Sequence, residues 1–150
     1  MDGLSAAASG MAVVSLAIQL VGSVRDIRRF LGNVSDAPKE LGRLIDLLEQ
    51  LELILENIGA QVENQRRQNG DRDTAASEMV LRAMKTCESK LKMLEDVVMN
   101  ARKTASATSK TTRALGSFKF ACKKKDLEGF ESQLHDAVSL LNLTITTNLT

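Results

Sequence analysis

Residues 3–24 read GLSAAASGMAVVSLAIQLVGSV, a run of 22 residues without a single charged side chain. Apolar residues continue through this run and beyond it at the three- and four-residue spacing of a helix, and they form one ridge: Val13, Ala17, Leu20, Val24, Ile27 and Leu31, flanked by Val14, Ile18 and Val21. The periodicity predicts a helix from about Leu4 to Leu31 whose apolar surface covers well over half of its circumference. Such a helix lies at the centre of a bundle or in lipid.

A second ridge of the same helix consists mainly of small or polar side chains: Ser5, Ser9, Ala12, Leu16, Gln19, Ser23 and Asp26. The helix is expected to end at Gly32-Asn33, because glycine suits the left-handed position that closes many helices.

A second helix is predicted after Ser35-Asp36-Ala37-Pro38, which offers capping side chains and a proline for the first turn. Its apolar stripe is Leu41, Leu44, Ile45, Leu48, Leu51, Leu55, Ile58 and Val62. The segment from Glu63 to Asp73 is polar and is expected to be a loop or a frayed helix end. A third helix, capped by Asp73 or Thr74, has the stripe Val80, Leu81, Met84, Cys87, Leu91, Leu94, Val98 and Ala101.

The last third of the chain is expected to contain a flexible connection, Lys103–Thr112, and a short helix with Leu115, Phe118 and Cys122. A final helix, with Asp126 as its N-cap, has the stripe Leu127, Phe130, Leu134, Val138 and Leu141. Its end, Leu143–Thr150, is rich in β-branched residues and is not expected to be firmly helical. These elements predict an all-α fold, an antiparallel bundle of four principal helices plus one short helix, in a single domain spanning residues 1–150.

The composition agrees with this fold class and excludes others. One proline, no tyrosine and no tryptophan argue against a β-rich fold, and good helix formers dominate. The 20 basic and 19 acidic residues nearly cancel, so no overall charge draws the chain to nucleic acid. Nucleic acid is therefore not expected among the partners.

The residues that usually carry catalysis or bind metals are few. Cys87, Cys122 and His135 supply fewer nitrogen and sulfur ligands than a structural zinc site needs, and no phosphate-binding glycine motif occurs. Nothing in the spacing pairs His135 with either cysteine. We therefore expect no enzyme activity, no cofactor, no metal and no small-molecule substrate. Two cysteines at core positions are expected to be reduced, which indicates a cytoplasmic protein.

The uncharged run raises the question of a membrane. Asp2 precedes it, so the basic start of a secretory signal is missing, although roughly 20 residues suffice to cross a bilayer. Eight of its 22 residues are Gly, Ser or Gln, which makes it a poor permanent span. Basic side chains follow at Arg25, Arg28 and Arg29 and again at Lys123, Lys124 and Lys125. They either complement helix ends and keep the surface soluble, or attract anionic lipid at about 1 kcal/mol per residue.

Two stretches resemble one known family. The start, MDGLSAAAS followed by Val13-Val14-Ser15-Leu16, resembles the opening of fungal STAND (NLR-like) receptors and related HeLo-like proteins. Residues 118–127, FKFACKKKDL, lead into Phe130, Leu134 and LLNL at 140–143, which is similar to the family's aromatic and basic segment and its leucine-spaced last helix. Phe118 or Phe120 stands where the family often has tryptophan.

The resemblance implies the N-terminal domain of a longer protein, a cell-death effector that oligomerises and whose first helix targets membranes, similar to the bundle of mixed-lineage-kinase-like necroptosis executors. The targeting helix would span Leu4 to Val24, with Met11, Val14, Ile18 and Val21 as lipid contacts. Its apolar members are Leu4, Met11, Val13, Val14, Leu16, Ile18, Leu20, Val21 and Val24. On activation the protein would self-associate and move from the cytoplasm to the membrane. The alternatives are an adaptor bundle that binds proteins and never touches lipid, and a structural spacer ahead of a receptor.

Overall fold

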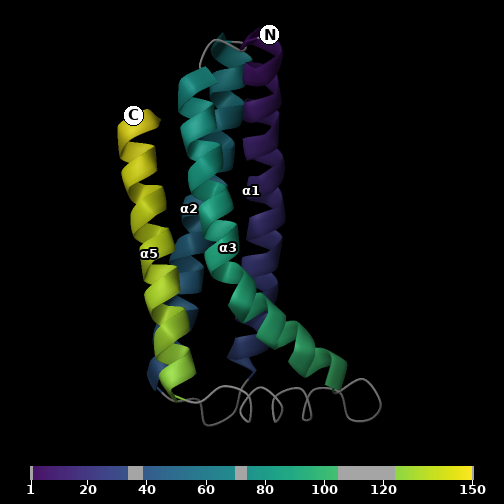
Figure 1. Cartoon of the computed structure of the whole chain (residues 1–150), viewed down its shortest axis with the longest axis vertical. Coiled ribbons are helices and arrows are strands. Elements are labelled where there is room, and N and C mark those ends of the chain that lie inside the picture. Colours follow the sequence, from purple (N-terminus) through teal and green to yellow (C-terminus); the bar gives the residue numbers. More distant parts are fainter. Residues whose placement is uncertain (1, 34–38, 70–73, 105–123, 150) are drawn as a thin grey trace.

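The computed structural model describes residues 2–33, 39–69, 74–104 and 124–149 of the chain, and these residues form four long helices (Figure 1). They are α1 (Asp2–Gly32), α2 (Lys39–Asn69), α3 (Thr74–Thr104) and α5 (Lys124–Asn148). The expected all-α bundle is confirmed. The short helix expected around Leu115, Phe118 and Cys122 and most of the connection expected at Lys103–Thr112 lie outside the described residues, although Lys103 and Thr104 still belong to α3.

The helices pack as a ring in which α1 adjoins α2 and α3, while α5 adjoins the same two helices from the other side. The chain alternates in direction, so α1 and α3 run away from the end where the N-terminus lies, and α2 and α5 run back toward it (Figure 1). The neighbours α1 and α2 are therefore antiparallel, as are α3 and α5. The neighbours α1 and α3 are parallel, because α3 does not follow α2 around the ring but lies diagonally across from it.

The core of the bundle is built from the predicted stripes. All six residues of the α1 ridge are buried: Val13, Ala17, Leu20, Val24, Ile27 and Leu31. In α2 the stripe from Leu41 to Val62 is buried except for Ile45, which is partly buried, and Leu47 joins it. Burying a leucine side chain contributes about 1.5–3 kcal/mol, so the packing of these stripes stabilises helices that would be marginal alone.

Two details predicted for the ends of α1 and α2 are wrong. α1 ends at Gly32-Asn33 as predicted, but Gly32 takes no left-handed conformation; the side-chain amide of Asn33 donates to the Arg29 carbonyl at 3.0 Å. The loop alternative for Glu63 onward fails as far as Asn69, because α2 continues to that residue. Glu63 pairs there with Arg66 at 3.0 Å and with Arg67 at 3.5 Å.

The end of α5 is also firmer than its β-branched residues suggested, since the helix runs to Asn148. Thr144 is buried and its hydroxyl donates to the Leu140 carbonyl at 2.7 Å, while Thr146 donates to the Asn142 carbonyl at 2.9 Å. Tertiary burial at Thr144 outweighs the weak helix propensity of threonine. At the other end, Asp126 lies in the first turn of α5 and is not the N-cap.

Candidate functional site

The outward face of α1 exposes large apolar side chains among polar ones such as Ser15 and Gln19. Ile18 is 70% exposed and Met11 is 56% exposed, while Val14, Leu16 and Val21 are half-buried. The other members of the predicted targeting helix point inward: Val13, Leu20 and Val24 are in the core. Leu4 belongs to α1, but its side chain lies outside the described residues. One helix thus has a buried apolar ridge and a second, exposed apolar surface.

This helix contains the one stretch of the described residues that is long and apolar enough to cross a bilayer. Gly10–Gly32 spans 23 residues, and its most apolar window has a mean hydropathy of 1.4. Length and composition alone give this result, and a core helix of a soluble protein can meet the same criterion. However, only 33% of that window is buried in the bundle.

A groove runs between the outward faces of α1 and α2, with a volume of about 550 Å³. Its lining is mainly apolar and includes several small residues: Val14, Ala17, Ile18, Val21, Gly22 and Arg25 from α1, and Leu55, Glu56, Gly59 and Ala60 from α2. Small residues bring the two helices close together here, because a Cβ at Gly59 would lie 3.3 Å from the Cβ of Ala17.

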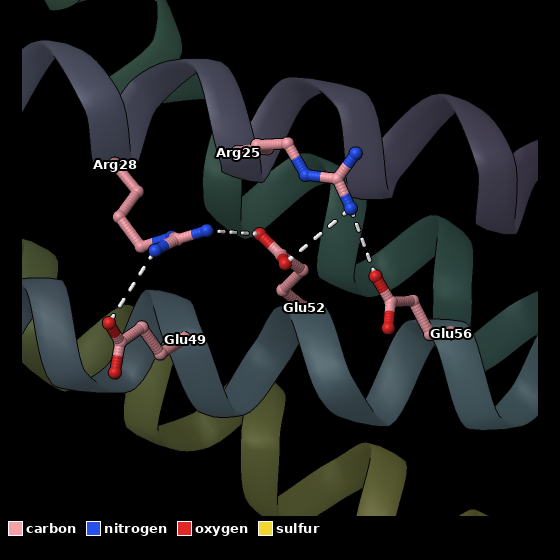
Figure 2. Close-up of polar contacts among 5 residues, drawn as sticks. All are labelled: Arg25, Arg28, Glu49, Glu52 and Glu56. Carbon is pink, nitrogen blue, oxygen red and sulfur yellow. Dashed lines mark hydrogen bonds and ion pairs between the residues drawn. The ribbon is translucent and has the colours of Figure 1, made fainter.

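A network of ion pairs joins the end of α1 to α2 (Figure 2). Arg25 lies 3.6 Å from Glu52 and 3.1 Å from Glu56, and Arg28 lies 3.0 Å from Glu52 and 3.5 Å from Glu49. Glu52 is shared by both arginines, and its side chain is only 13% exposed. The pairs of Glu52 are therefore shielded from water more than an ordinary surface pair, whereas those of Glu49 and Glu56 are largely exposed and contribute less.

The same end of α1 is tied to α3. Arg102 binds the Asp26 carboxylate with both terminal nitrogens, at 2.6 Å and 3.2 Å, and its guanidinium lies 5.3 Å from the centre of the Phe30 ring. Bidentate pairing and stacking on an aromatic face are both typical of arginine. Residues 25–30 are therefore held on two sides.

Two of the predicted lipid-binding cations are engaged in these ion pairs while α1 is packed in the bundle. Arg25 and Arg28 face carboxylates of α2 in this structure, whereas Arg29 is exposed. The other cluster is far from them along the chain: Lys125 is exposed at the start of α5, the side chain of Lys124 is not described, and Lys123 lies outside the described residues. The structure thus gathers the three arginines at one end of α1.

Conventional catalytic features are weak in the part of the chain that the structure describes. Cys87 is fully buried, and burial raises the pKa of its thiol to about 12, which suppresses the reactive thiolate. His135 is exposed. No group of His, Cys, Asp and Glu suited to a metal occurs among the described residues. A polar recess of about 350 Å³ between α1 and α3 contains Lys92 among acidic neighbours, with no nucleophile–base pair.

Sequence reasoning missed the partners of the arginines. Glu49, Glu52 and Glu56 recur at three- and four-residue spacing on α2, and Arg25 and Arg28 are three apart on α1. Matching these spacings across an antiparallel pair would have suggested the network. Asp26 and Arg102, which are 76 residues apart, offered no such signal. Comparison with protein-family models, curated proteins and solved structures gives no match for this chain.

Proposed function

We propose that this chain is a cell-death effector bundle of the HeLo-like kind, which self-associates and inserts α1 into a membrane. The observation that carries the proposal is the exposed apolar surface of α1. The other described helices also expose single large apolar residues, such as Leu53 and Met93, but α1 alone combines them with a stretch long enough to span a bilayer. The resemblance of residues 1–16 and 118–143 to that family adds support.

At rest α1 is packed in the bundle, and on activation it would exchange its apolar contacts for hydrocarbon. Lipid tails are about as apolar as leucine, so hydrocarbon can replace the core contacts of the apolar residues in the uncharged run 3–24, while self-association would have to cover the stripes that α1 leaves behind. The charged end would remain at the membrane surface, because arginine at the bilayer centre costs at least about 2.5 kcal/mol. Arg29, which is exposed, would there meet anionic headgroups, while Arg25 and Arg28 keep their glutamate partners on α2.

A reversible staple tests whether α1 must leave the bundle. Ala17→Cys with Gly59→Cys, in a Cys122→Ser background, places two Cβ atoms 3.3 Å apart, so the helices need to separate by a few tenths of an ångström to reach the usual Cβ spacing of a disulfide, about 3.5–4.5 Å. The chain is fused to an inducible oligomerisation module and mixed with dye-filled anionic vesicles. We expect leakage from the reduced protein, no leakage from the oxidised protein, and recovery after reduction. Each single-cysteine variant is the control. Equal leakage in both redox states, or none in either, would contradict the proposal.

The groove between α1 and α2 favours a second function, an adaptor bundle that binds a protein helix and never touches lipid. Ile18 at its edge and Ala17, Gly59 and Ala60 in its lining would suit a close helix contact. This function predicts self-association or partner binding without vesicle leakage. Sedimentation velocity of the same samples, with and without vesicles, separates the two functions.

A further inference from the structure

Charge divides α1 into two unequal parts. Residues 3–24 have no charged side chain, and over residues 10–24, whose side chains are described, apolar packing holds this part of the helix in the bundle. The ion pairs of Arg25 and Arg28 with α2, and of Asp26 with Arg102 of α3, all begin after it. Hydrocarbon can replace apolar contacts, but it cannot replace ion pairs. The two parts of α1 therefore differ in how readily they can leave.

The first charged residue of the second part is Arg25, and Gly22-Ser23 lies just before it. Glycine weakens a helix interior, and sharp helix kinks are commonly found at Gly/Ser pairs. Gly22 is exposed, and a Cβ there would meet nothing within 4 Å, so packing does not explain the glycine. Gly10, which follows Ser9, differs: a Cβ there would lie 3.0 Å from the Arg66 side chain, which would have to shift to admit it.

We propose that Gly22-Ser23 is a hinge that separates a releasable arm, residues 4–21, from a base, residues 24–32, which stays bound to α2 and α3. The arm swings out while the ion pairs of the base keep α1 attached. Its role in membrane insertion rests on the proposed function, but the hinge itself is a property of the chain in solution and can be tested without lipid.

Hydrogen exchange of the backbone amides in solution tests the hinge. We expect residues 10–21 to share one exchange rate, residues 24–31 to exchange more slowly, and a step between them. Gly22→Ala should slow the whole arm, as far as Met11, by roughly fivefold and leave the base unchanged, because alanine makes the bend more costly. Gly42→Ala on α2 is the matched control, since Gly42 is also helical, exposed and free of neighbours within 4 Å.

The outcomes separate the hinge from simple fraying. The hinge is supported if the exchange rate changes abruptly at residues 22–23 and if Gly22→Ala, but not Gly42→Ala, slows exchange in the arm. The hinge is overturned if exchange rates change smoothly from the N-terminus or if all of α1 exchanges at one common rate. It is also overturned if Gly22→Ala and Gly42→Ala slow the arm equally. Co-sedimentation with phosphatidylcholine–phosphatidylserine vesicles then addresses the function separately: a step in exchange without any vesicle binding upholds the hinge and counts against membrane insertion.

Discussion

The Cβ of Ala17 on α1 lies 3.3 Å from the position that a Cβ would take at Gly59 on α2. This spacing is tighter than ordinary van der Waals contact, so the two helices approach as closely as their side chains permit. The contact lies in the groove between their outward faces.

A larger side chain at Gly59 should therefore push α1 away from α2. We expect Gly59→Leu to lower the free energy of unfolding by about 1–3 kcal/mol, the usual cost of overpacking. Urea denaturation followed by circular dichroism measures this. Gly42→Leu, at an open site on the same helix, is the control and should not destabilise the protein. Equal stability of the two variants would show that the close approach does not limit packing.

Ile18 offers a test of the membrane proposal that leaves the core intact. At 70% exposed it contributes little to folding, whereas Leu20, 2% exposed, cannot accept a charge without unfolding the bundle. Ile18→Lys should keep its helix content and lose most vesicle leakage, because the cost of lysine inside a bilayer is about 2.5–3.5 kcal/mol. Leu53→Lys, at a similarly exposed leucine of α2, should cause as much vesicle leakage as the wild type. Normal leakage by Ile18→Lys would argue against insertion of this face.

Glu52 is the centre of the network between α1 and α2, so its charge should matter more than that of other glutamates. We expect Glu52→Gln to lower the free energy of unfolding by about 1–2 kcal/mol. This value is smaller than for a fully buried pair, because both arginines are partly exposed to water. Glu131→Gln, which breaks a single 2.9 Å pair with the exposed Arg43, should have a smaller effect. Thermal unfolding at low and high salt measures the stability of both variants. The difference in stability between wild type and Glu52→Gln should be smaller at high salt, because salt screens the wild-type ion pairs.

Burial of Cys87 gives the bundle a defined response to high pH. Because its pKa is raised from 9.0 to about 12, the unfolded state releases a proton above pH 9 that the folded state retains. The sign follows: the Cys87 contribution to stability is complete below pH 9 and is lost as the pH rises from 9 toward 12. Wild type should lose stability more steeply than Cys87→Ala over that range. In Cys122→Ser, the remaining thiol should resist alkylation at pH 8 until denaturant unfolds the chain.

The order of residues along the chain is enough to define the helices and the sides that they bury. The ridge from Val13 to Leu31 lies in the core because helical periodicity places those side chains on one face, and any neighbour would cover it. The absence of charge between Gly3 and Val24 likewise distinguishes α1 from the other helices by sequence alone.

Which faces meet, and where the helices stop, depends instead on tertiary packing. Helical periodicity does not specify which helices are neighbours in the ring. It could therefore not predict that α3 lies beside α1 or that Arg102 pairs with Asp26. The ends of α2 and α5 extend past their predicted limits, because ion pairs at Glu63 and burial of Thr144 stabilise turns with weak local propensity. On α1, packing also separated the apolar residues: Val13 and Leu20 lie in the core, while Met11 and Ile18 remain exposed. The uncharged run is thus one helix with two apolar surfaces, of which the bundle covers one.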